Sequence, residues 1–164
     1  MSLRAFRRDD VGATAIEFAF VAPMAIALII ATIEVGMLEV VSSNLDAAVM
    51  DVARKIRTGA SDRPANTTAL VDMICANMVE SSADCHARLK TSVQVTPNFA
   101  DAGPAAGAAA TGQFNAGGAG DIVLVRATYT WPLILPMYAG NFQLAGPTQA
   151  ILDTRAAFRN EPYA

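Results

Sequence analysis

The stretch Asp9–Glu34, DDVGATAIEFAFVAPMAIALIIATIE, decides how the chain is organised. Across residues 13–33 its only charged side chain is Glu17, and past Glu34 the apolar run continues through Val35 to Leu38. About 20 consecutive apolar residues cross a bilayer as a helix. The pattern therefore predicts a transmembrane helix over residues 13–38.

The residues before this stretch predict its orientation. Arg4, Arg7 and Arg8 precede it, and segments rich in Lys and Arg stay on the cytoplasmic side of a membrane. A cleaved secretory signal needs a shorter apolar stretch, about 7–15 residues, with a small-residue cleavage site after it. A plain single-pass anchor remains an alternative, but it leaves Glu17 unexplained, since a carboxylate in hydrocarbon costs about 2.5 kcal/mol or more.

The helix is predicted to continue beyond the membrane as far as residue 58. Gly59 follows Lys55 and Arg57, and a glycine after basic residues is typical of a helix C-terminus. Over residues 39–58 this extracytoplasmic part carries one apolar stripe, which must pack on the C-terminal domain, on neighbouring copies, or on both. The stripe recurs every three or four residues, as one helix face does: Leu38, Val41, Leu45, Ala48, Val52 and Ile56.

The start of the apolar run carries a family resemblance. Gly12 is followed by Ala13-Thr14-Ala15-Ile16-Glu17-Phe18, which resembles the processing site of type IV prepilins. The sequence GATAIEFAFVAP is similar, more narrowly, to TadE-like pseudopilins of Tad (tight adherence, type IVc) pili. The tail AAFRNEPY, residues 156–163, also resembles the close of such proteins. The resemblance implies that a prepilin peptidase removes residues 1–12 as a cytoplasmic leader by cutting between Gly12 and Ala13.

The resemblance also suggests why Glu17 lies in an apolar segment. Cleavage would create an α-amine on Ala13, and a neighbouring subunit shifted along a filament would set its Glu17 against that amine. Glu17, followed by Phe18, would then set the register between neighbouring subunits in assembly. The alternative is a favourable interaction with the helix dipole, worth up to about 1 kcal/mol. Pro23 removes a helix hydrogen bond and predicts a kink.

Residues 59–164 are predicted to form an extracytoplasmic domain with a second helix. That helix spans about residues 67–79, capped by Asn66. Cys75 falls within it and Cys85 in the loop after it; outside the cytoplasm such a pair is a good candidate for a disulfide. A metal site that adds Asp84 and His86 to the cysteines lacks the tight paired spacing of zinc motifs, so we expect no metal.

Three alternating segments predict strands over residues 87–97, 121–134 and 148–162. The fold class is therefore α+β: a long N-terminal helix packed on a small three-stranded antiparallel sheet, with a second short helix. Residues 100–120 are dominated by Ala and Gly and predict a flexible loop. Residues 132–147 form a long connection whose packing the sequence does not decide.

The composition argues against some classes of function, among them nucleic-acid binding. The formal net charge is −3 without a basic stripe, which argues against nucleic-acid binding. One histidine and scattered acids form no catalytic group, so we expect neither an enzyme nor a cofactor. The resemblance implies a minor pilin or pseudopilin in the bacterial inner membrane that takes part in assembly or priming of an adhesive Tad pilus. Its implied partners are the prepilin peptidase, other pilins and the inner-membrane assembly platform.

Two other function classes stay open at this point. The chain fits an unprocessed single-pass envelope protein with an extracytoplasmic binding domain, and less well a membrane-anchored enzyme. Processing after Gly12 separates the pilin from both, and turnover of a substrate identifies the enzyme.

Overall fold

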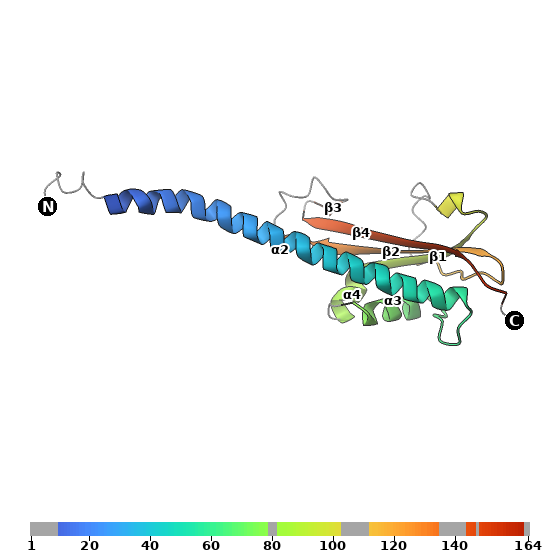
Figure 1. Cartoon of the computed structure of the whole chain (residues 1–164). Coiled ribbons are helices and arrows are strands. Elements are labelled where there is room, and N and C mark those ends of the chain that lie inside the picture. Colours follow the sequence, from blue (N-terminus) through green and yellow to red (C-terminus); the bar gives the residue numbers. More distant parts are fainter. Residues whose placement is uncertain (1–9, 79–81, 103–111, 135–143, 147, 163–164) are drawn as a thin grey trace. The chain divides into compact units, whose positions relative to one another are not determined.

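The protein is described here by a computed structural model covering residues 10–78, 82–102, 112–134, 144–146 and 148–162. It divides into two compact units, residues 1–37 and residues 38–164. Helices and strands follow one another in this order (Figure 1): α2 Asp10–Arg57, α3 Thr67–Ala76, α4 Ser82–Arg88, β1 Leu89–Thr96, a 3-10 turn Ala100–Ala102, β2 Ile122–Pro132, β3 Leu144–Gly146 and β4 Gln149–Arg159.

Helix α2 continues through Pro23 and ends where the sequence predicts. Gly59 adopts a positive φ of 64°, which a residue without a Cβ adopts at little cost. Its N–H donates to the carbonyl of Ile56, 3.1 Å, and the N–H of Ala60 donates to that of Lys55, 3.0 Å. These two bonds form a Schellman motif, which satisfies carbonyls that the helix end leaves unpaired. The kink at Pro23 stays a prediction.

The sheet is antiparallel, with strand order β1-β2-β4-β3. Its register aligns Val93 of β1 with Val125 of β2, and Val125 with Ala156 of β4. Because side chains alternate between the two faces, this register places Val93, Val125 and Ala156, from the three long strands, on the same face. The predicted α+β fold, a long helix with an antiparallel sheet and a short second helix, is confirmed.

The core of the second unit lies between this sheet face and the helices. In Figure 1 the C-terminal half of α2 runs across the sheet, with α3 and α4 beside it. Tyr129 is fully buried, and the single tryptophan, Trp131, packs against the core from its margin. All six residues of the predicted stripe are buried: Leu38, Val41, Leu45, Ala48, Val52 and Ile56.

Several local features differ from the sequence prediction. Cys85 was expected in a loop, but it lies in the short helix α4, because Ser82–Arg88 forms two turns before β1. Part of the undecided connection, Leu144–Gly146, adds the short edge strand β3. Residues 112–115, within the predicted flexible loop, are held by hydrogen bonds along the outer edge of β1. Residues 103–111 of that loop lie outside the described residues.

Candidate functional site

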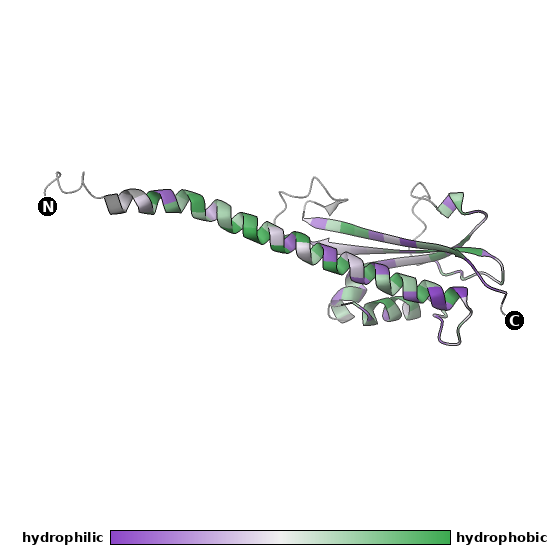
Figure 2. Cartoon of the chain, in the orientation of Figure 1, coloured by the Kyte–Doolittle hydropathy of each residue, from purple (hydrophilic) through white to green (hydrophobic). Residues whose placement is uncertain are grey.

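The N-terminal half of α2 is apolar and exposed. One helix among the described residues, Thr14–Arg57, is long and apolar enough to cross a membrane, and only 6% of its most apolar window is buried. The core helix of a soluble protein would be mostly buried. Figure 2 shows the apolar residues along this half. Those with large exposed side chains are Ile16, Phe18, Phe20, Val21, Met24, Ile26, Leu28, Ile29 and Ile33.

Gly12 lies in the first turns of this helix. A Cβ added to Gly12 would meet no atom within 4 Å. Packing within the chain therefore does not require a glycine there, although glycine in a helix costs about 0.5–1 kcal/mol relative to alanine. A Cβ added to Gly36, further along α2, would also meet no atom within 4 Å. Gly36 is therefore a matched control position for substitutions of Gly12.

Glu17 follows one turn later and is exposed. Its neighbours on the helix surface are apolar and exposed as well, with Phe18 at 72% and Phe20 at 73% exposure. Within the part of the chain that the structure describes, no ion pair includes Glu17. An acidic side chain thus projects from an otherwise apolar surface, five residues after Gly12.

A family model described as TadE-like protein matches residues 12–54. The long helix is TadE-like. The match begins at Gly12 and covers nearly all of α2, so it includes the glycine, the glutamate and the exposed apolar half. No curated protein and no solved structure matches the chain. TadE-like proteins are associated with Tad pili, and the match makes this helix similar to theirs.

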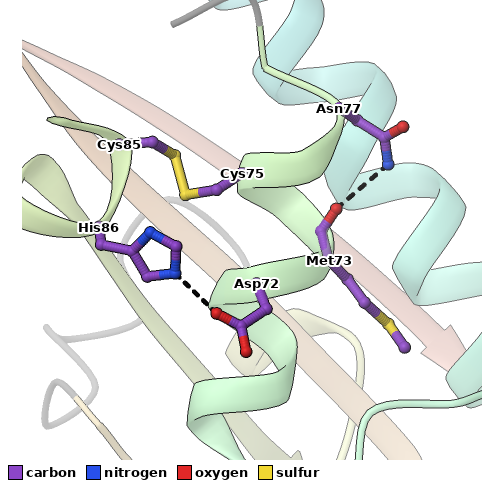
Figure 3. The surroundings of a disulfide bond; sticks show 6 residues. All are labelled: Asp72, Met73, Cys75, Asn77, Cys85 and His86. Carbon is purple, nitrogen blue, oxygen red and sulfur yellow. Dashed lines mark hydrogen bonds and ion pairs between the residues drawn. A yellow bond between two sulfur atoms is a disulfide. The ribbon is translucent and has the colours of Figure 1, made fainter. Parts of the chain in front are cut away.

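Outside the TadE-like segment, α3 and α4 are joined at two points (Figure 3). Cys75 and Cys85 form a disulfide, with their Cα atoms 5.7 Å apart. Nε2 of His86 lies 2.6 Å from Oδ1 of Asp72, which links the same two helices. Among the described residues, no group of three His, Cys, Asp or Glu is placed to hold a metal ion. In this arrangement the disulfide and the His86–Asp72 contact both link α3 to α4.

A charged cluster lies on the outer face of the sheet, and no local pattern in the sequence predicts it. Asp153 of β4 accepts from Arg126 Nε of β2 at 2.7 Å, and Arg155 lies 2.7 Å from its other oxygen. Thr128 Oγ1 donates to Oδ1 of Asp153, the oxygen that also accepts from Arg126, at 3.2 Å. Burial favours the neutral carboxyl, but the hydrogen bonds from the two arginines outweigh it and lower the pKa of Asp153. Only the register, which sets Arg126 opposite Arg155, shows why a carboxylate is needed between them.

The C-terminal tail holds several segments together. Asn160 is 2% exposed, and its Nδ2 donates to the carbonyls of Ala116, at 2.8 Å, and Gly118, at 3.0 Å. The N–H of Glu161 donates to the carbonyl of Arg57 at the end of α2, 2.9 Å. The tail therefore fixes the end of β4 to the end of the helix, a role that its sequence alone did not reveal.

Proposed function

We propose that this chain is a minor pilin or pseudopilin that takes part in assembly or priming of a Tad pilus. The observation that carries the proposal is the TadE-like helix, whose exposed apolar half begins at Gly12 and presents Glu17. In this proposal residues 13–38 cross the bacterial inner membrane. The N-terminus is cytoplasmic and residues 39–164 lie in the periplasm. The arginines before the helix support that orientation.

Processing supplies a partner for Glu17, which makes no ion pair among the residues that the structure describes. A prepilin peptidase hydrolyses the bond between Gly12 and Ala13, which gives Ala13 an α-amine with an ordinary pKa of about 7.7–8. That amine is cationic at neutral pH. The Glu17 carboxylate of a subunit shifted along the assembly pairs with it, and each group offsets much of the cost of placing the other in a poorly hydrated site.

The mass of the protein from its native membrane tests the processing step. We expect an N-terminus at Ala13 for the wild type, and the longer precursor for Gly12→Ser, because the added side chain blocks the peptidase. Gly36→Ser is the matched control, since neither glycine has a neighbour that a Cβ would meet. It should be processed normally. A wild-type start at Met1 or Ser2, with the cognate peptidase present, would reject the pilin and favour an unprocessed envelope protein.

Substitution of Glu17 tests its assembly role. Glu17→Ala should leave the processed protein in the membrane while lowering the number of surface pili about ten-fold or more, which corresponds to the loss of about 1.4 kcal/mol or more of pairing. Glu39→Ala removes another exposed carboxylate of the same helix and should leave pilus number unchanged. Pili are counted by electron microscopy and the protein by immunoblot. Normal piliation by Glu17→Ala would show that Glu17 sets no register.

A further inference from the structure

The two long edges of the sheet are protected differently. Along β1, the N–H of Val93 donates to Gln113 O and its C=O accepts from Asn115 N, both at 2.9 Å. Gly112 N likewise donates to Thr91 O, 3.0 Å. Along β4, strand β3 pairs only with the first residues, 149–150. From residue 151 to residue 159, no strand among the described residues pairs with β4 on the side away from β2.

The hydrogen bonds show which backbone groups of β4 face this open edge. In an antiparallel sheet, alternate residues direct both N–H and C=O to the same neighbouring strand. Thr91 and Val93 direct their N–H and C=O groups away from β2. Their partners in β2, Ala127 and Val125, therefore direct theirs toward β4, where they bond the even-numbered residues Thr154 and Ala156. The N–H of Asn160 likewise donates to the C=O of Asp121, just before β2, so the even-numbered residues of β4 direct their backbone groups toward β2. Odd-numbered residues such as Asp153 and Ala157 therefore face the open edge.

A groove of about 300 Å³ lies beside this edge, between the second half of α2 and residues 155–158 of β4. Its apolar lining includes Met50, which is 56% exposed, and Phe158. Its charged side chains come from α2, Arg54 and Arg57, and its lining includes no carboxylate. Arg155 also borders the groove, but its guanidinium pairs with Asp153 on the outer face of the sheet.

Arg54 and Arg57 have acidic partners that lie outside the groove. Arg54 pairs with Asp51 at 3.5 Å and Arg57 with Glu161 at 3.4 Å, both through partly exposed side chains. Exposed pairs of this kind contribute little and exchange readily. The groove thus combines an apolar floor, a cationic rim and an adjacent row of strand-edge donors and acceptors.

We propose that an extended acidic segment of a partner protein adds as a strand to the open edge of β4 and places a carboxylate against Arg54 and Arg57. Backbone hydrogen bonds to an open edge supply affinity in such strand addition, and side-chain pockets supply specificity. Guanidinium groups match a carboxylate in geometry and charge. A second copy of β4 would instead bring Arg155 and Arg159 to the cationic groove. The proposal does not depend on cleavage after Gly12.

Fluorescence anisotropy on the full chain in neutral detergent micelles tests the proposal. The probes are two end-blocked, labelled peptides of about ten residues, long enough to follow the open edge. Both alternate valine with polar residues, and they differ only in carrying glutamate or lysine. We expect saturable binding of the glutamate peptide and at least about ten-fold weaker binding of the lysine peptide.

Two variants locate the binding site. Ala157→Pro removes one N–H that faces the open edge and none that faces β2, a position that tolerates proline on an edge strand. It should weaken binding of the glutamate peptide about ten-fold, whereas Ala157→Val, which keeps the N–H, should not. Arg54→Gln, outside the sheet, should weaken it about three-fold and reduce its salt dependence, even if Ala157→Pro fails to fold.

Three outcomes would overturn the proposal. They are no saturable binding of the glutamate peptide, equal binding of both peptides, and binding by Ala157→Pro that matches Ala157→Val. Dimerisation of the chain that Ala157→Pro abolishes, measured by analytical ultracentrifugation, would assign the edge to a second copy and also overturn it. A wild-type N-terminus at Met1 would reject the proposed processing without affecting this result.

Discussion

The two halves of helix α2 are both rich in apolar residues but lie in different surroundings. In the N-terminal half apolar side chains surround the helix and are exposed, as Leu28 is at 66%. In the C-terminal half most of them form one buried stripe, and charged residues such as Asp46 and Arg54 occupy the other faces. An apolar stripe is the pattern of a helix that packs on one surface, whereas an all-round apolar helix needs apolar surroundings on every side. Distribution around the axis, rather than apolar content, separates the two environments.

The largest expected effect on stability comes from shortening one leucine in each half. Leu45 is 1% exposed, so Leu45→Ala should lower the free energy of unfolding of the second unit by about 3 kcal/mol or more, through lost burial and a cavity. Leu28→Ala should change it by less than about 0.5 kcal/mol. Urea titration of the full chain in detergent, followed by Trp131 fluorescence, measures both. Equal destabilisation by the two variants would contradict the division of the helix.

Removal of the disulfide should have the next largest effect, confined to the second unit. The paired variant Cys75→Ser with Cys85→Ser loses the cross-link of a short loop, which corresponds to about 2.5–3 kcal/mol in the chain-entropy model. The same urea titration measures the loss, and alkaline carbonate extraction tests membrane attachment. Attachment should be unchanged, because it depends on the exposed half of α2. Release of the variant from the membrane would contradict this separation.

The smallest effect is expected for Asp153→Asn, which leaves Arg126 and Arg155 opposite each other without a carboxylate between them. We expect a loss of about 2 kcal/mol, since charged hydrogen bonds are removed from a mostly buried site. Asp46→Asn, on the exposed face of α2, is the matched control and should be near neutral.

The pH dependence of stability sharpens this test. The pKa of Asp153 is lower in the folded protein than its ordinary value of 3.8, so its contribution is complete above that value. It is lost as the pH falls through the lower folded pKa, because the unfolded chain then binds a proton more readily. Asp153→Asn should remove this part of the acid destabilisation. An identical pH profile for wild type and variant would show that the arginines do not stabilise the carboxylate.

Local rules predicted much of the fold from the sequence. Gly59 ends α2 and Asn66 caps α3, accepting from Ala69 N at 2.9 Å, because helix ends depend on a few adjacent residues. The strands followed from their alternating sequence, and the TadE-like helix followed from its apolar run and the residues around Gly12.

The features that escaped prediction depend on contacts between distant segments. Nothing near Phe114 indicates that residues 112–115 cover β1, since the hydrogen bonds come from a strand about twenty residues earlier. The bond from Glu161 to Arg57 and the ion pairs of Asp153 likewise require the folded register. The processing site and the role of Glu17 involve other molecules, so they remain predictions.

The link between the tail and the end of α2 also has a mechanical consequence. Near the start of the second unit, Leu38 clusters with Ala150 at the beginning of β4; at the other end, Glu161 bonds Arg57. Strand β4 therefore runs alongside this half of α2, in the same direction. Tension between the helix and the C-terminus would pull β4 lengthwise along β2, so their ladder of hydrogen bonds would carry the load together in shear rather than open one by one.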